Sequence, residues 1–385
     1  MPKIKRLPLI LLAVIQTFTL IVLPVHAQAP MLSVSAKSAV LIEAESGTVS
    51  YEKSAYTRLP MASTTKLMTA LTALELMSPD TIIRAHPDAI GVEGSSIYLI
   101  ANEALTLEQL LYAMLLESAN DAAAAIAIGI SGSIDAFAAE MNHKALSLGL
   151  KDTRFTNPHG LDHEDHYTTA YELALIARAV LKNDLLKTIV STRKTTIPHA
   201  GTDSMRLLVN HNKLLRLYDG CIGMKTGYTQ RSGRCLVSAA MRDGVTLIAV
   251  TLNASDDWND HTRMLDYGFR QFMSHTLCKE GELTYPLPVV GGSEGVVMLS
   301  NTEALSVTLP IASGKITRTI EGERFGYASI NEGEILAHAV FRCDVDGDGV
   351  REIIGKVPLK ACKSIERKIV KKGFFTWLFG LFSRK

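Results

Sequence analysis

The chain has 385 residues, enough for more than one domain with its own hydrophobic core, and its composition is that of an ordinary globular protein. Residues 1–27 hold three basic residues and no acid, and residues 363–385 hold seven basic residues and one acid. Between them remain 30 basic and 38 acidic residues. A basic tail on an acidic body favours an anionic surface as a partner and argues against nucleic acid.

Residues 1–27 are typical of a secretory signal peptide. Three basic residues precede an apolar run over residues 7–25, and Val25-His26-Ala27 offers small residues for cleavage after Ala27. The alternative is an uncleaved anchor, but polar residues and Pro24 interrupt the run. Both interpretations place the body outside the cytoplasm, at the outer face of the cytoplasmic membrane.

The next segments predict a strand hairpin over residues 39–52 and a helix over residues 62–77 that is buried on most sides, because Lys66 and Glu75 are its only charges. Further elements follow from the periodicity of the apolar residues. Helices are expected at 106–117, 121–130, 133–148, 169–182 and 257–274, and strands at 222–228, 234–241 and 246–253. Strands at both ends of a helical middle predict a mixed α/β (α+β) sheet with a helical subdomain.

The pattern changes after about residue 275. Short apolar-polar alternations predict a small all-β domain with strands at 283–290, 295–299, 305–309, 316–320, 335–345 and 353–357. The chain then ends in a basic segment and an aromatic tip, too short to span a bilayer. We expect an amphipathic helix at 361–385 that lies in the membrane surface; the alternatives are packing on the β domain or a dimer interface.

Three short motifs occur in a fixed order: Ser63-Thr64-Thr65-Lys66, Ser118-Ala119-Asn120 and Lys225-Thr226-Gly227. Each is weak alone, and Ser191-Thr192-Arg193-Lys194 repeats the first spacing. A serine hydroxyl needs a base to become a nucleophile, and a spacing of one helical turn directs Ser63 and Lys66 to the same side. Burial among apolar groups lowers the pKa of a lysine, which provides neutral amine to act as that base.

With these motifs the chain resembles the low-molecular-mass penicillin-binding D-alanyl-D-alanine carboxypeptidases, peptidase family S11. Tyr218-Asp219-Gly220-Cys221 and the stretch from Asp256 to His261 resemble the sporulation-type members from Gram-positive bacteria. The resemblance implies the penicillin-binding, serine β-lactamase-like transpeptidase fold for residues 28–275. A small β domain at 276–360 and the terminal helix would follow.

The resemblance also implies roles for the motif residues. Ser63, Lys66, Ser118 and Asn120 would be catalytic, with Ser118 moving a proton to the leaving group and Asn120 holding the substrate amide. Lys225, Thr226, Gly227 and Tyr228 would bind the substrate. Lys225 and Thr226 suit a terminal carboxylate, Gly227 permits close approach, and the backbone N–H groups of Ser63 and Tyr228 would form the oxyanion hole.

The expected function is removal of the terminal D-alanine from peptidoglycan stem peptides through an acyl-enzyme on Ser63, with β-lactams as inhibitors. No cofactor and no metal are expected. The first rival is a serine β-lactamase, but a Glu-x-x-Leu-Asn motif is missing from the sequence. The second rival is a penicillin-binding sensor or scaffold without turnover. One departure stands out: Thr251 to Asp257 lacks the arginine with which many relatives bind the substrate carboxylate.

Three other patterns allow two interpretations. The cluster of His159, His163, Asp165 and His166 suits a structural loop better than a metal site. The run from Asp344 to Gly349 starts like a calcium loop, but its twelfth position is glycine, so a hairpin turn is expected. The five cysteines leave at least one unpaired, and a Cys221–Cys235 bridge depends on the strand register.

Overall fold

The computed structural model describes residues 32–199 and 203–369. The expected signal peptide, residues 1–27, lies outside the described residues, as does the chain from residue 370 on. Residues 362–369 are described and are not helical: Ile365 is buried and bridges Ile330, and Arg367 bridges Gly292. The first nine residues of the segment expected to be a helix, 361–369, are therefore not helical.

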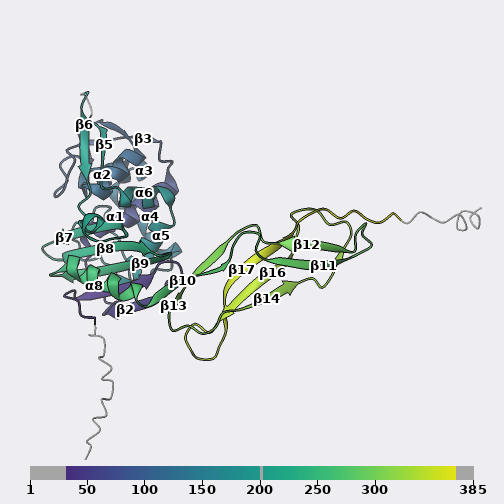
Figure 1. The fold of residues 1–385 in the computed structure, drawn as a ribbon. Helices are drawn as coiled ribbons and strands as arrows, with labels where there is room; N and C mark the ends of the chain where they lie inside the picture. Colours follow the sequence, from purple (N-terminus) through teal and green to yellow (C-terminus); the bar gives the residue numbers. More distant parts are fainter. Residues whose placement is uncertain (1–31, 200–202, 370–385) are drawn as a thin grey trace, which may run out of the picture. The chain divides into compact units, whose positions relative to one another are not determined.

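A five-stranded antiparallel sheet in the order β2-β1-β9-β8-β7 organises the part of the chain before the C-terminal β strands (Figure 1). Its strands are β1 (Ser38–Glu43), β2 (Val49–Lys53), β7 (Cys221–Thr229), β8 (Gly233–Arg242) and β9 (Val245–Ala254). The first two form the hairpin that the sequence predicts, and they join the C-terminal strands through β1 and β9, where Val40 lies opposite Val250. Strand β7 is at the edge of this sheet and has a strand neighbour, β8, on one side only.

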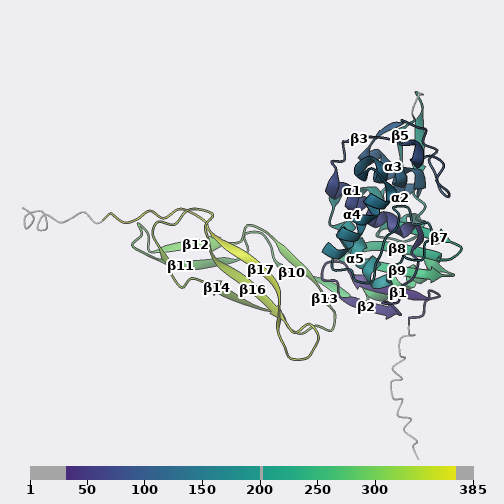
Figure 2. The ribbon, with the colours of Figure 1, turned by 180° about the vertical axis from the view of Figure 1, so that it is seen from behind.

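The helices that the periodicity predicts are present within a few residues of their expected limits. They are α1 (Lys66–Leu76), α2 (Leu107–Leu116), α3 (Asn120–Ser131), α4 (Ile134–Ser147), α5 (Ala170–Leu181) and α8 (Asp257–Phe269). Local signals fix several ends: Thr106 and Gln109 form a capping box at α2, and Gly132 ends α3 with a positive φ. Helices α1 to α5 lie together in the same part of the molecule (Figure 2).

Several short elements were not predicted from the sequence. They are the 3₁₀ turns η1 (Ala62–Thr65) and η2 (Pro87–Ala89), the hairpins β3 (Ile82–Arg84) with β4 (Ala104–Thr106) and β5 (Lys194–Pro198) with β6 (Met205–Val209), the helices α6 (Asp184–Ser191) and α7 (Leu214–Leu217), and the strand β15 (Gly326–Tyr327). The last predicted helix, 257–274, is wrong at its end: it stops at Phe269, and strand β10 (Phe272–Cys278) begins three residues later.

The C-terminal part is all β, as expected. A six-stranded sheet has the order β14-β16-β17-β12-β11-β15, and β10 pairs with β13. The strands are β11 (Thr284–Val290), β12 (Val296–Ser300), β13 (Leu305–Pro310), β14 (Thr317–Gly322), β15 (Gly326–Tyr327), β16 (Ile335–Cys343) and β17 (Glu352–Ala361). This part has a hydrophobic core of its own that includes Leu287, Leu299 and Leu359.

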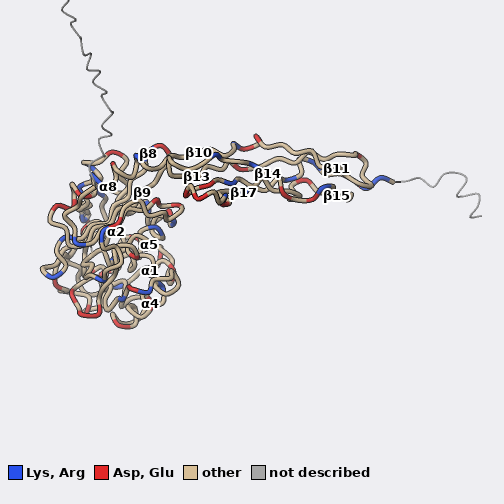
Figure 3. The backbone as a smooth tube through the Cα atoms, turned by 90° about the horizontal axis from the view of Figure 1, so that it is seen from below, with Lys and Arg blue, Asp and Glu red and all other residues tan. Residues whose placement is uncertain are grey.

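The acidic run at 344–349 is the turn between the antiparallel strands β16 and β17, as the hairpin interpretation expects. Asp344 accepts hydrogen bonds from the backbone N–H groups of Gly347 (2.8 Å) and Gly349 (3.0 Å). Its carboxylate thus shapes the turn. Figure 3 shows charged residues of both signs along the tube, where tan segments predominate.

All five cysteines are free. The strand register explains why Cys221 and Cys235 do not bridge: Cys221 lies opposite Ala240, whereas Cys235 lies opposite Gly227, six residues further along β7. Within the described residues, no single helix is long and apolar enough to cross a membrane; one bent pair, Asn120–Ser131 with Ile134–Ser147, meets the test by length and composition.

Candidate active site

Ser63 and Lys66 meet at the junction of η1 and α1. Ser63 lies in the 3₁₀ turn rather than in the α-helix that the sequence predicts, and Lys66 is the first residue of α1. Their side chains are in direct contact, because Lys66 Nζ donates a hydrogen bond to Ser63 Oγ at 2.9 Å. The expected juxtaposition of hydroxyl and amine is therefore present.

Lys66 is completely buried and has two further oxygen partners. Its Nζ donates to Asn120 Oδ1 at 2.6 Å and to the backbone carbonyl of His159 at 2.6 Å. Burial, and secondly the positive charge of Lys225, hold the pKa of Lys66 well below its ordinary value. A lowered pKa increases the share of neutral amine, which is the form that a general base requires.

Asn120 is fixed from both ends of its side-chain amide. Its Oδ1 receives the bond from Lys66, and its Nδ2 donates to the carbonyl of Glu93 at 2.5 Å. Ser118 precedes it in the short connection between α2 and α3, with a positive φ of 60° that turns the chain between the two helices. Both residues are buried at 4–6 % exposure, and Ser118 lines the same cleft as Ser63.

Strand β7 brings the third motif against the serine. A Cβ atom at Gly227 would lie 3.0 Å from the backbone nitrogen of Ser63 and 3.1 Å from Cβ of Ala62, so glycine permits this close approach. Lys225 is buried and its Nζ donates to the carbonyl of Thr226 at 2.9 Å. Burial lowers the pKa of Lys225 to about 7.

The loop from Asn157 to His166 supports the serine turn from the opposite side. Gly160 has a φ of +89°, and a Cβ atom there would lie only 2.0 Å from the carbonyl oxygen of Ala62. His166 Nε2 is 2.7 Å from Oγ1 of Thr65. Burial lowers the pKa of His159 to about 3 and that of His166 to about 4, so both rings are neutral and serve as packing and hydrogen-bonding groups.

For the cluster that includes His159, the sequence favoured a structural loop over a metal site, and the structure uses the backbone carbonyl of His159 as a partner of Lys66. Every residue has a backbone carbonyl, so residue type alone cannot show which carbonyl accepts this hydrogen bond. The glycine that follows, which requires a positive φ, is the available signal. Among the described residues, His, Cys, Asp and Glu side chains form no group of three or more with metal-binding geometry.

These groups surround a cleft of about 580 Å³. Its lining comprises Ser63, Ser95, Ser118, His211, Thr226, Gly227, Tyr228, Arg234, Asp257 and Trp258. Five of the expected site residues thus share one cleft, and the other three, Lys66, Asn120 and Lys225, are buried. The sequence interpretation did not include Ser95, Arg234, Asp257 and Trp258.

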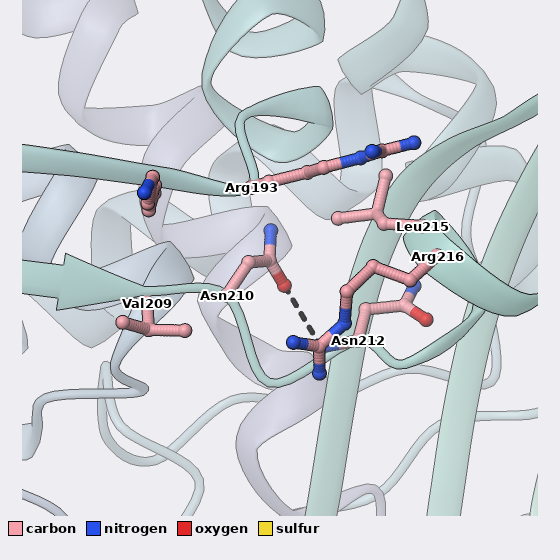
Figure 4. A pocket seen from close by; sticks show the side chains of 7 residues that line it. Arg193, Val209, Asn210, Asn212, Leu215 and Arg216 are labelled. Carbon is pink, nitrogen blue, oxygen red and sulfur yellow. Dashed lines mark hydrogen bonds between the residues drawn. The ribbon is translucent and has the colours of Figure 1, made fainter.

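His211 reaches the cleft from a segment whose other side borders a second hollow of about 200 Å³ (Figure 4). There Asn210 donates from Nδ2 to the carbonyls of Val190 (3.2 Å) and Thr192 (3.1 Å), and its Oδ1 accepts from the backbone N–H of Asn212. These bonds fix the chain on both sides of His211.

Comparison with known proteins agrees with this geometry. The family model of D-alanyl-D-alanine carboxypeptidases, Peptidase_S11, matches residues 24–256. The chain belongs to this family. It is 34% identical over 353 residues to the D-alanyl-D-alanine carboxypeptidase DacF of Bacillus subtilis (strain 168), which covers 89% of this chain and 88% of the relative. A D-alanyl-D-alanine carboxypeptidase of Streptomyces sp. (strain K15) is 36% identical over 242 residues, covering 58% of this chain and 83% of the relative.

Solved structures of the family extend the agreement to the fold. A peptidoglycan synthesis regulatory factor from Streptococcus pneumoniae superimposes with a TM-score of 0.71 at 25% identity, covering 87% of this chain and 100% of that structure. The Streptomyces K15 DD-transpeptidase superimposes with a TM-score of 0.59 at 32% identity, covering 62% and 98%. The predicted penicillin-binding fold with a C-terminal all-β part is confirmed.

Proposed function

We propose that Ser63 is the nucleophile of a serine D-alanyl-D-alanine carboxypeptidase that trims peptidoglycan stem peptides. The observation that carries this proposal is the contact of Ser63 Oγ with a buried lysine, at 2.9 Å, inside a cleft that the other two motifs also line. Family membership supports the reaction, and the geometry of Ser63 and Lys66 supports the roles proposed for them. Penicillins, which present a comparable carbonyl and carboxylate, acylate the same serine.

Lys66 acts as the base for acylation. A neutral amine has two N–H bonds and one lone pair, and Lys66 Nζ has three oxygen neighbours. The two N–H bonds are directed to Asn120 and to the carbonyl of His159, which leaves the lone pair for the hydroxyl proton of Ser63. The buried carbonyl and amide oxygens thus orient the base as well as hold it.

The reaction follows in two steps. Ser63 Oγ bonds to the carbonyl carbon of the penultimate D-alanine, and its proton passes to Lys66; the C–N bond then breaks, and the departing amine of D-alanine receives a proton through Ser118. Water then attacks the carbonyl carbon of the resulting ester, and the shortened peptide is released. The proton that water loses passes to Ser63 Oγ, which restores the hydroxyl. Backbone N–H groups of Ser63 and Tyr228 stabilise the oxyanion in both steps, and the close approach at Gly227 supports this placement.

The enzyme works outside the cytoplasm, where its substrate is. We propose that residues 1–27 direct export and that the basic, aromatic C-terminal segment binds the outer face of the cytoplasmic membrane. Lys363, Arg367 and Lys368 begin that segment within the described residues, and the excess of basic residues continues to residue 385. No cofactor takes part in the chemistry described above.

Mass spectrometry of the protein without residues 1–27 tests the nucleophile and the reaction together. Penicillin should add one penicilloyl mass to the proteolytic peptide that carries Ser63, and a peptide ending in D-Ala-D-Ala should release D-alanine. Ser63→Ala should abolish both. Ser191→Ala is the matched control, because Ser191 begins the repeated Ser-x-x-Lys spacing but donates to the carbonyl of Thr188 on α6. No adduct and no D-alanine from folded wild-type protein would refute the proposal.

A further inference from the structure

The cleft must hold the negative charge of its substrate, because a carboxypeptidase acts on peptides with a free terminal carboxylate. Among the described residues that line the cleft, Arg234 is the one lysine or arginine. Lys225 is 1 % exposed and its amine is bonded to the carbonyl of Thr226. A pKa of about 7 also leaves Lys225 only partly charged at neutral pH, whereas a guanidinium keeps its charge.

Strand register places Arg234 beside the third motif. Arg234 lies directly opposite Tyr228 in the antiparallel pair of β7 and β8, which run side by side (Figure 1). Thr226 is two residues before Tyr228, so the alternation of the strand directs all three side chains to one face. Arg234 therefore projects from the neighbouring strand toward the same part of the cleft as the hydroxyl of Thr226.

A buried acid and an aromatic ring fix the guanidinium. Arg234 Nε and Nη2 both contact Asp257 Oδ1, at 2.9 and 2.7 Å, and the Asp257 side chain is 5 % exposed. The Trp258 ring centre is 5.8 Å from the guanidinium carbon. Asp257 in turn accepts from the backbone N–H of Trp258, which ties the assembly to the first turn of α8.

This arrangement leaves donors for a ligand. A guanidinium carries five N–H donors in a planar fork, and Asp257 engages only Nε and Nη2. The Arg234 side chain is 43 % exposed and lines the cleft, so a ligand in the cleft can reach its guanidinium. A fixed, charged and partly unpaired fork is suited to a carboxylate.

We propose that Arg234, held by Asp257 and Trp258, is the residue that binds the terminal carboxylate of the substrate and so selects peptides with a free C-terminus. It takes the place of the arginine that the stretch from Thr251 to Asp257 lacks, and it comes from the strand before that stretch. The inference rests on the proposed function, since it concerns the substrate of the Ser63 site.

The test compares two donors, a peptide ending in D-Ala-D-Ala and its C-terminal amide. Arg234→Gln should lower kcat/KM for the acid by about tenfold to a hundredfold, the range for a lost hydrogen bond to a charged group, and should leave the amide nearly unchanged. The ratio of kcat/KM for the acid to kcat/KM for the amide should therefore fall by about the same factor. Arg231→Gln removes the same charge from an exposed position three residues away that does not line the cleft, and should keep the wild-type ratio.

Two further variants separate binding from folding. Arg234→Lys keeps the charge without the fork and should give an intermediate ratio. Asp257→Asn should lower the ratio as well, and the double variant Arg234→Gln/Asp257→Asn should be no worse than Arg234→Gln, because both substitutions affect one contact. Each variant is first checked for one penicilloyl group per chain at saturating penicillin, which reports an intact Ser63 site.

The outcomes are distinct. A wild-type acid-to-amide ratio in Arg234→Gln, or an equal loss in Arg231→Gln, overturns the assignment of Arg234. If Arg234→Gln fails the penicillin check, the ratio in Arg234→Lys decides: a reduced ratio supports the proposal and an unchanged one overturns it. If the wild-type protein itself forms no adduct, the proposed function fails, which is a different result from a change in the ratio.

Discussion

The two buried lysines of the site come from opposite walls of the cleft and have different surroundings. Lys66, on the helical wall, has three oxygen partners drawn from η1, α3 and the loop at 157–166. Lys225, on the strand wall, donates to the carbonyl of the next residue in its own strand. Burial lowers the pKa of both, and the charge of Lys225 lowers the pKa of Lys66 further.

The different surroundings of Lys66 and Lys225 suit two different tasks, that of a base and that of a positive charge. A base must be held at one geometry relative to the hydroxyl, and the three partners of Lys66 provide that. A charge that acts through space does not need such precision, so Lys225 can influence Lys66 and the cleft from within β7. We therefore propose that the helical wall performs proton transfer and that the strand wall, with Gly227 and Arg234, receives the substrate.

The largest expected effect is on the helical wall. Lys66→Ala should slow penicillin acylation of Ser63 by about 10²- to 10⁴-fold, the usual contribution of a general base. Stopped-flow or quenched acylation kinetics would measure the rate. Lys194→Ala is the control, since Lys194 holds the same place in the repeated Ser-x-x-Lys spacing but is exposed on β5. A Lys66→Ala protein that acylates within tenfold of wild type would assign the base elsewhere.

A smaller effect is expected from the loop that supplies the third partner of Lys66. Gly160→Ala adds a positive-φ penalty and a Cβ atom 2.0 Å from the carbonyl oxygen of Ala62, which must displace the loop and the carbonyl of His159. We expect a loss of about 3 kcal/mol or more in the free energy of unfolding, from backbone strain plus overpacking. Acylation should slow in the variant as well.

Gly149→Ala is the matched control. Gly149 also has a positive φ, +77°, but a Cβ atom there meets nothing within 4 Å. It should cost only about 1 kcal/mol, the strain alone, and leave acylation unchanged. Urea unfolding and acylation rates measure both. Equal losses in the two variants would mean that the contact with Ala62 has no role in placing the loop.

Features that depend on a local stretch of sequence could be predicted, whereas features that depend on tertiary contacts could not. Periodicity located α1 to α5 and the strands of both sheets except the two-residue β15, because each of these signals lies within one element. The order of the three motifs predicted a shared site, and Ser63, Ser118 and Thr226 do line one cleft. The 3₁₀ turn at Ser63 depends instead on tertiary contacts, here from Gly160 and Gly227, which no local window contains.

Arg234 shows the same limit on the substrate side. Its position beside Thr226 depends on the register of β7 and β8, and its orientation depends on Asp257, 23 residues later in the chain. A search for the missing arginine at its usual place therefore finds nothing. The useful signal would have been the strand pairing, since the tight turn between β7 and β8 places residues 228 and 234 opposite each other.

The smallest predicted effect concerns pH and separates the contributions of the two cations. Lys225 has a pKa of about 7, so its charge is present below that pH and is lost as the pH rises through it. Acylation needs the neutral form of Lys66, and the loss of the Lys225 charge should make the acylation rate decline through about pH 7. The decline in wild type should be less than about tenfold, because Arg234 keeps its charge.

Acylation rates measured from pH 5 to pH 9 test this directly. In Arg234→Gln the decline should deepen, since Lys225 is then the remaining cation of the strand wall, and in Lys225→Arg it should disappear because arginine stays charged. A decline of the same depth in wild type and Arg234→Gln would mean that the two cations do not share the substrate's charge. The carboxylate would then depend on one of them alone, and the acid-to-amide ratio identifies which.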